Sequence, residues 1–270
     1  MSTLAAYGAA GAGIVRRDVR LYLSYRGRIF SQLLAVFFSI SLFYYIAKLV
    51  HVGTFQTPVE YFGYVVVGVA ILEVLGATLT GLPPMLRQEL MAGTFERLVI
   101  SPTGAVASTV AMLIFPTFVA MLTGTVAICY GVLVFGLPLR GDTAALAIPV
   151  AFLAATAFAP FALLIGGLVL AVKRAGTAAG FVVTGLSLVG GFFFPVALLP
   201  VWIRWLAQVQ PFTPALNLLR NLLIGTPLVE PEWLSVAKLI GFTAVLFPVS
   251  VWTLARGVRW AQRRGTIIEY

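Results

Sequence analysis

One acidic residue, Glu73, stands inside an apolar stretch, residues 61–86, that carries no other charge. A carboxylate at the middle of a membrane costs several kcal/mol unless it is paired or faces water. Glu73 can therefore line a transport path and select cationic or hydroxyl-rich molecules, or it can form a structural hydrogen bond within a helix bundle. The sequence leaves both interpretations open.

The stretch 84–102 carries both signs of charge between two apolar stretches. Gly93-Thr94 interrupts this stretch, and Ser101-Pro102 ends it, which is typical of a short helix followed by a break. We expect a helix at about 84–101 that lies across the membrane surface. A mixed-charge helix in that place suits docking of a soluble partner, although a solvated connector explains the same pattern.

Aromatic residues Tyr44 and Tyr45 fall near the end of another apolar stretch. They are candidates for contacts along a transport path. An interfacial belt of aromatic side chains explains them as well, and we favour the belt.

Residues typical of catalysis or metal binding are scattered. His51 has no second His or Cys nearby, the single cysteine Cys129 lies in an apolar run, and the serines lack a basic partner. The sequence also lacks the glycine- and lysine-containing loop that cradles nucleotide phosphates. We expect no catalytic residue, no metal and no cofactor bound by this chain.

The composition determines which elements carry these residues. The chain has 270 residues, of which 60% are apolar and only 10% charged, whereas a soluble domain has about a quarter charged residues. This predicts an all-α membrane protein and excludes a soluble enzyme, a disordered chain or a disulfide-stapled secreted fold. The net charge of +9 is typical of cytoplasmic loops in a membrane protein, so we expect no nucleic-acid partner.

Uncharged or nearly uncharged stretches predict six transmembrane helices, because about 20 apolar residues span a bilayer. We expect them at about 29–49, 59–81, 106–135, 144–172, 177–195 and 235–255. The resulting organisation is a cytoplasmic N-terminus at 1–28, a membrane domain at 29–255 and a basic cytoplasmic tail at 256–270. Most of the 18 Lys and Arg residues then fall on one side. By the positive-inside rule, both termini are cytoplasmic and the membrane is the inner (cytoplasmic) membrane.

Two segments do not fit a simple bundle. Residues 14–28 place apolar residues at helical spacing and direct Arg16, Arg17 and Arg20 elsewhere, which favours an amphipathic helix in the membrane interface. An ordinary basic flank is the alternative. Residues 195–233 hold six of the 15 prolines, so they cannot form one spanning helix. We expect a broken re-entrant hairpin at about 196–227.

Two sequence runs suggest a family. Residues 93–102 read GTFERLVISP, and a second run comprises LPVW at 199–202, QPFTPA at 210–215 and LR at 219–220. Together with the six-span layout they resemble the permease subunits of type-2 ATP-binding-cassette exporters, in the drug-resistance branch typified by daunorubicin exporters. Gln210 departs from the family pattern, in which Asn is more usual.

The resemblance implies a permease that works as a dimer, here a homodimer, in contact with membrane lipid and two separate ATPase subunits. ATP and Mg would be bound by the ATPase, with residues 84–101 as the coupling helix and 14–28 as the interface helix. The implied coupling residues are Arg87, Glu89, Gly93, Thr94, Phe95, Glu96 and Arg97.

The cargo implied by the resemblance is a hydrophobic or amphipathic compound, such as a drug, a natural product or a lipid. An exporter of a lipid-linked cell-surface polysaccharide is the alternative within the class. An intramembrane enzyme is disfavoured because His and acidic residues do not cluster. An ion-coupled transporter is disfavoured because the broken segment occurs only once.

Overall fold

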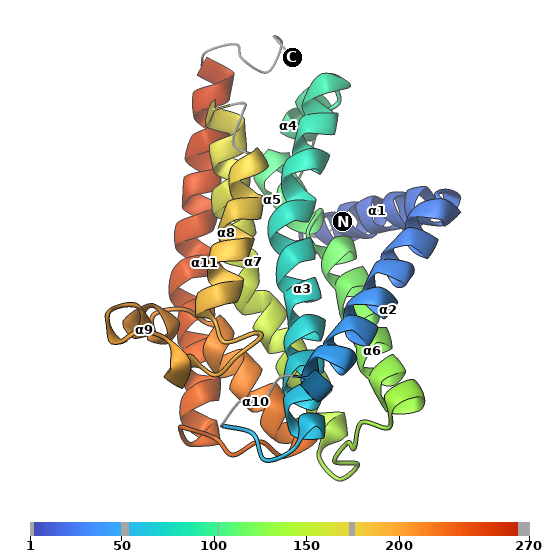
Figure 1. Ribbon diagram of the computed structural model, residues 1–270. Coiled ribbons are helices and arrows are strands. Elements are labelled where there is room, and N and C mark those ends of the chain that lie inside the picture. The colour runs from blue at the N-terminus through green and yellow to red at the C-terminus, as the bar shows by residue number, and fades with distance from the viewer. Residues whose placement is uncertain (1–2, 50–53, 102, 173–175, 264–270) are drawn as a thin grey trace.

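The computed structural model describes residues 3–49, 54–101, 103–172 and 176–263, and within these ranges every regular element is a helix. Side chains are described for the same ranges except 3–10, 171–172 and 176–179. Most of the long helices run side by side as a bundle, and α1 lies across them (Figure 1). The chain is thus an all-α protein in the part that the structure describes.

The elements follow one another in this order. The longer helices are α1 (Thr3–Ser24), α2 (Arg26–Leu49), α3 (Pro58–Met91), α6 (Ile114–Phe135), α7 (Ala147–Val172) and α11 (Glu232–Arg263). The shorter helices are α4 (Phe95–Ile100), α5 (Gly104–Ala111), α8 (Gly176–Val189), α9 (Val201–Gln208) and α10 (Phe212–Ile224), with 3-10 turns η1 (Ala144–Leu146) and η2 (Val196–Leu198).

The two ends of the bundle differ. One end holds α4 and the last turns of α11, with α1 and α5 in the same half of the molecule, and we call it the basic end (Figure 1). The opposite end holds the beginning of α3, the loop between α6 and η1, and the loop between α10 and α11.

Helix α3 forms the centre of the bundle. It begins with Pro58 at its first position, and the Thr57 side chain accepts a hydrogen bond from the Glu60 backbone N–H at 3.2 Å, an N-terminal cap. Of its 18 most apolar consecutive residues, 67% are buried, whereas the share is 11–39% for the corresponding windows of the other four long apolar segments. A helix that is apolar on all faces is expected at the core.

The structure accounts for five of the six expected spans. Among the described residues, five helical segments are long and apolar enough to cross a membrane: Arg26–Leu49, Pro58–Met91, Gly104–Phe135, Ala144–Leu170 and Glu232–Arg263. Where a span was expected at 177–195, helix α8 ends at Val189. Its 14 residues measure about 21 Å, less than the roughly 30 Å of a hydrocarbon core. The six-helix count is therefore not confirmed.

Helix α8 ends early because two glycines follow it. Gly191 has φ of +82°, a conformation that residues with a Cβ rarely adopt, and this turns the chain out of the helix. The short helices α9 and α10 follow, in the segment where a broken hairpin was expected, and α10 runs on to the opposite end (Figure 1).

The predicted coupling helix has different bounds in the structure. Residues 84–91 are the last turns of α3, which continues through Pro83 and Pro84, and only residues 95–100 form the separate helix α4. A proline inside a helix costs about 3 kcal/mol. Leu82, Leu86 and Leu90 keep the helical spacing and are buried in one core with residues of neighbouring helices. This packing on both sides of the prolines keeps the chain helical there.

The two ends of the chain also differ from expectation. The amphipathic helix expected at 14–28 is α1, which begins at Thr3, ends at Ser24 and is followed at once by α2. Helix α11 extends to Arg263, so the first part of the expected tail is helical, while residues 264–270 lie outside the described residues.

Candidate functional site

The basic end brings together residues from the predicted interface helix and the predicted coupling segment. The Arg17 guanidinium of α1 donates from Nη1 to Oε1 of Glu89 at 2.6 Å and from Nε to Oδ1 of Asp18 at 3.0 Å. The Thr94 hydroxyl donates to the other carboxylate oxygen of Glu89. We call Arg17, Asp18, Glu89 and Thr94 the basic-end cluster. It ties α1 to the turn between α3 and α4.

That turn depends on Gly93 and Phe95. The Thr94 backbone N–H donates to the Glu89 carbonyl at 3.0 Å, which closes the end of α3, and Gly93 has φ of +66°. The Phe95 ring is fully buried and packs in the same core as Leu86 and Leu90. The turn is therefore held from inside the protein.

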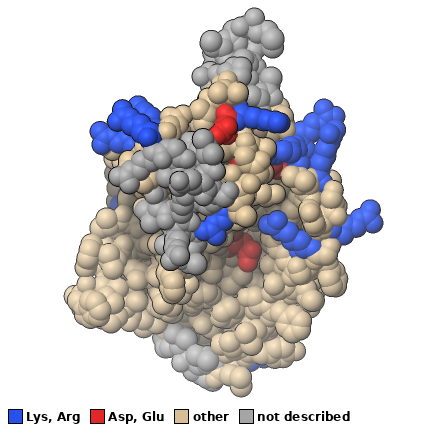
Figure 2. All heavy atoms as spheres, turned by 90° about the horizontal axis from the view of Figure 1, so that it is seen from above, with Lys and Arg blue, Asp and Glu red and all other residues tan. Residues whose placement is uncertain are grey.

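The remaining predicted coupling residues point outward. Glu96 and Arg97 on α4 and Arg87 near the end of α3 are exposed, as are Arg16 and Arg20 on α1. Figure 2, which views this end from above, shows basic side chains around its rim with acidic ones among them. Lys173, Arg174 and Arg264, which were expected on the same side, lie outside the described residues.

Asp18 is the electrostatically unusual member of the cluster. It is 5% exposed, and its Oδ2 atom has no hydrogen-bond partner in the described part of the chain. Burial raises the pKa of the Asp18 carboxyl, Arg17 opposes this change, and the nearby Glu89 carboxylate adds to it. The cluster thus holds two carboxylates close to one guanidinium.

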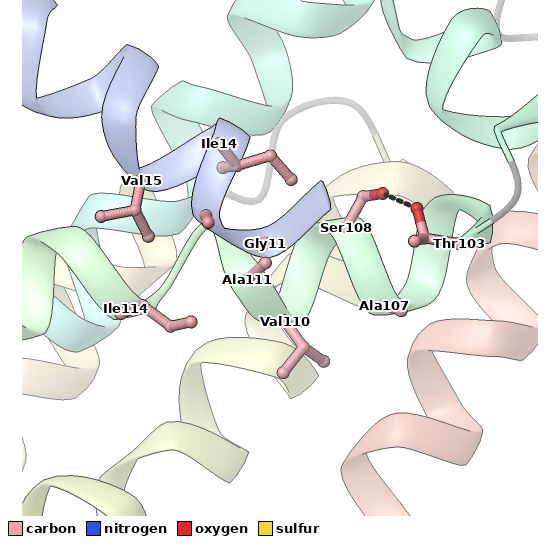
Figure 3. Close-up of a pocket in the computed structure, with 10 residues that line it drawn as sticks. Gly11, Ile14, Val15, Thr103, Ala107, Ser108, Val110, Ala111 and Ile114 are labelled. Atoms are coloured by element: carbon pink, nitrogen blue, oxygen red, sulfur yellow. Dashed lines mark hydrogen bonds between the residues drawn. The ribbon is translucent and has the colours of Figure 1, made fainter. Parts of the chain in front are cut away.

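A hollow of about 370 Å³ lies beside this cluster, between α1 and α5 (Figure 3). Ile14 and Val15 of α1 and Val110 and Ala111 of α5 are among the residues that line it, and at its edge the Thr103 and Ser108 hydroxyls form a 3.2 Å hydrogen bond. Its lining is apolar, so it seats α1 on the bundle and supplies no catalytic chemistry.

Glu73 lies on the least covered face of α3. Its side chain is half-buried, Thr80 on the same face is exposed, and the space beside Gly76 is open. Within the described ranges no hydrogen bond or ion pair to the Glu73 carboxylate is formed. The carboxylate is thus available to a molecule or a second subunit that covers this face.

Tyr44 and Tyr45 have different surroundings. The Tyr44 ring stacks on Phe135 with centroids 4.3 Å apart and also contacts the Phe62 ring, so it fills the packing between α2, α3 and α6. The Tyr45 ring points outward and is exposed. Tyr44 thus packs between helices while remaining half-buried, and a role of either tyrosine along a transport path stays a prediction.

Arg220 is a buried charged residue to which sequence reasoning assigned no role. It is 1% exposed, and its guanidinium donates from Nε to the Tyr64 carbonyl at 3.1 Å and from Nη2 to the Phe192 carbonyl at 2.9 Å. The available signal was one arginine at helical spacing among leucines in the run LNLLRNLLI. A charge in such a run must find buried partners.

Among the described residues, no three His, Cys, Asp or Glu side chains are grouped as metal ligands are.

Comparison with known proteins identifies the family. No curated protein matches the chain. The family model of the ABC-2 type transporter matches residues 14–224, from α1 to the end of α10. This match spans most of the chain and covers both the basic-end cluster and Arg220. The chain therefore belongs to the ABC-2 type transporter family, as a permease subunit of an ABC transporter with an ATPase partner.

Proposed function

We propose that the chain is the permease of an ATP-driven exporter that moves a hydrophobic or amphipathic compound across the cytoplasmic membrane. Family membership supports a transport subunit, and the drug-resistance branch is supported by the GTFERLVISP run at 93–102. The bundle is apolar, and the Glu73 carboxylate lies on the open face of α3. Drugs, natural products and lipids are the cargo classes that fit these features.

The observation that carries the proposal is the joining of α1 to the α3–α4 turn through Arg17 and Glu89. The two elements meet at the basic end, where α4 displays Glu96 and Arg97. A soluble protein bound beneath this end can push on both elements at once, and the partly exposed link between them can open and close as they move. ATP and Mg are bound by that partner, a separate ATPase present in two copies.

The charge distribution supports the orientation. Basic side chains surround the end that holds the α3–α4 turn (Figure 2), and basic residues collect in cytoplasmic segments of membrane proteins. The last turns of α11 lie at this end in Figure 1, and α1 lies in the same half of the molecule. The basic end therefore faces the cytoplasm, where the ATPase is.

We further propose that two copies of the permease pair as a homodimer and that cargo passes along their shared surface. The open face of α3 with Glu73 is the part of the central helix that the monomer leaves uncovered. A carboxylate there favours cationic or hydroxyl-rich groups of the cargo.

Transport by the purified complex tests the function. The chain is produced together with its ATPase partner, and rhodamine 6G, a fluorescent phospholipid or a polyprenyl-linked glycan is supplied as a separate probe on the outer face of inside-out vesicles, which is their cytoplasmic face. ATP-dependent movement of rhodamine 6G or the phospholipid supports the proposal. Movement of the glycan alone favours the polysaccharide exporter, and the absence of ATP-dependent movement of all three refutes the proposed function.

Glu96→Ala combined with Arg97→Ala tests the coupling surface. We expect ATP hydrolysis to continue while transport per ATP falls at least about fivefold, as for a lost coupling free energy of 1 kcal/mol or more. Arg259→Ala, which removes an exposed charge from α11 at the same end, is the matched control. Equal transport per ATP in the double variant and the control refutes the coupling role.

A further inference from the structure

Three backbone carbonyls lie in a row where α8 ends inside the bundle, at Gly190, Gly191 and Phe192. They belong to the break between α8 and η2, so they are outside a helical hydrogen-bond ladder. A membrane interior offers no water to satisfy such groups, and each needs a donor from the protein.

Each of these carbonyls accepts a hydrogen bond from a different side chain. The Thr213 hydroxyl donates to Gly190 O at 3.2 Å and the Tyr64 hydroxyl to Gly191 O at 3.0 Å. Arg220 completes the row with its 2.9 Å bond to Phe192 O. We call Tyr64, Thr213 and Arg220 the carbonyl cap. Tyr64 comes from α3 and the other two from α10, so the cap joins three parts of the chain.

Arg220 is the centre of the carbonyl cap because it bonds two elements at once. Besides Phe192 it bonds the carbonyl of Tyr64, and its guanidinium carbon lies 3.3 Å from the centre of the Tyr64 ring. No acidic side chain pairs with it among the described residues. Its charge is balanced by the ring face and by carbonyls near the C-terminal end of α8, where a cation is favoured.

The approach of the break to α3 requires a glycine. A Cβ atom at Gly68, one turn after Tyr64, would lie 2.0 Å from Phe192 O and 3.0 Å from Nη2 of Arg220. The missing side chain lets the Phe192 carbonyl reach α3 directly. The break is therefore in contact with the backbone of α3 as well as with its side chains.

Helix α3 connects the carbonyl cap with the basic-end cluster. Tyr64 and Glu89 belong to the same uninterrupted helix, and at 1.5 Å per residue they are about 37 Å apart along its axis. The contacts thus form a continuous path from the α3–α4 turn along α3 to Tyr64, and from there through the cap to the break and α10.

We propose that Arg220 is a positioning residue for transport, which fixes the break after α8 to α3 so that α9 and α10 move with α3. The proposal rests on the ATP-driven export proposed above. Lysine cannot replace arginine in this role, because one ammonium group lacks the planar fork that reaches two carbonyls in fixed directions.

Arg220→Lys in the full chain tests the carbonyl cap directly. Amide hydrogen exchange is measured in lipid nanodiscs, with Arg140→Lys, at an exposed arginine of the opposite end, as the matched control. We expect exchange within 190–215 to become at least about tenfold faster in Arg220→Lys alone, because a buried charge-assisted hydrogen bond is lost. If the exchange rates within 190–215 are the same in Arg220→Lys and in the control, the carbonyl cap is refuted, whatever the transport measurement gives.

The positioning role is measured in the complex with the ATPase. We expect ATP hydrolysis by Arg220→Lys to stay within about twofold of the control, because Arg220 bonds the carbonyls of Tyr64 and Phe192 and no residue of the basic-end cluster. Transport of rhodamine 6G or the fluorescent phospholipid per ATP should fall at least about fivefold. Faster exchange with unchanged transport per ATP means that the cap is only structural and overturns the positioning role.

A second variant covers the case in which Arg220→Lys does not fold. Tyr64→Phe removes one hydroxyl bond and keeps the ring beneath Arg220, and Tyr45→Phe, at an exposed tyrosine, is its control. We expect a smaller change in the same two readouts, and wild-type values in both overturn the proposal. If the wild-type complex moves none of the probes in the presence of ATP, the proposed function fails, and the positioning role fails with it. The hydrogen-exchange measurement still decides whether the carbonyl cap exists.

Discussion

Gly68→Ala is the smallest change that tests the packing of the break against α3. The added methyl would meet the Phe192 carbonyl oxygen at 2.0 Å and the carbonyl carbon at 2.9 Å. Both are backbone atoms, so no flexible side chain can turn aside to make room. Either α3 or the break must shift by about 1 Å or more to restore an ordinary contact.

The expected loss follows from the bonds that this shift breaks. A displacement of this size takes the 2.9 Å bond between Arg220 and Phe192 O beyond hydrogen-bond distance. A hydrogen bond to a charged group contributes about 1.5–3 kcal/mol, and a buried cation short of a partner adds to the loss. Alanine returns about 0.5–1 kcal/mol through its helix propensity. We expect a net destabilisation of about 2–3 kcal/mol, or a Tm lower by roughly 4–10 °C.

Gly76→Ala on the same helix is the matched control, because the space beside Gly76 is open. Its Tm should stay unchanged or rise slightly. Thermal unfolding of both variants is followed by tryptophan fluorescence in the same detergent. A Tm for Gly68→Ala equal to or above that of Gly76→Ala would refute the reasoning.

Three further predictions concern charged side chains. Glu73→Gln should reduce transport of the cation rhodamine 6G about tenfold, equivalent to about 1.4 kcal/mol, and leave transport of the phospholipid unchanged. The control Glu232→Gln, at an exposed residue, should alter the transport of neither probe. An equal loss of transport for both probes contradicts a charge-selective path. A double-mutant cycle of Arg17→Met and Glu89→Gln should give a coupling in the free energy of unfolding of about 1 kcal/mol or less, because the Arg17 side chain is 41% exposed. A coupling of several kcal/mol contradicts a weak link. Because burial raises the folded-state pKa of Asp18 above its unfolded value, its protonated form favours folding, and this stability is lost as pH rises through the folded pKa. Asp18→Asn should therefore raise the Tm at pH 8, with a gain that disappears toward pH about 4, and an equal gain at both pH values contradicts this assignment.

Several features were predictable because they depend on local composition. Apolar stretches of about 20 residues predicted the five helices long enough to cross a membrane. Gly93-Thr94 predicted the turn after α3, and the structure places positive φ at Gly93. The charge pattern also placed Arg17 and Glu89 at one end, although only the structure shows that they bond.

Other features depend on packing that the sequence does not display. Pro83 and Pro84 favour a helix end, but buried leucines on both sides of them continue α3 to Met91. The apolar run 177–195 was long enough for a span, and the reason it is not one continuous helix is the Gly190-Gly191 break held by side chains of other helices. In each case a tertiary contact overrides local preference.

The carbonyl cap lay beyond sequence reasoning for the same reason. Arg220 bonds the backbone of Tyr64, 156 positions away, and no local pattern joins these residues. The run LNLLRNLLI shows one arginine among leucines, but it does not show which residues that arginine bonds.

The two polar clusters on α3 differ in strength, and this difference assigns them different parts in a transport cycle. The link between Arg17 and Glu89 is partly exposed, so its breakage costs little and water can replace either partner. Arg220 is fully buried, and separating it from its carbonyls would leave a cation without a partner in an apolar core. A transport cycle driven from the basic end can therefore break and re-form the bond between Arg17 and Glu89 in each cycle, while the bonds of Arg220 stay intact. Helix α3 then moves together with the break after α8, and the freedom to rearrange lies between α1 and the rest of the bundle.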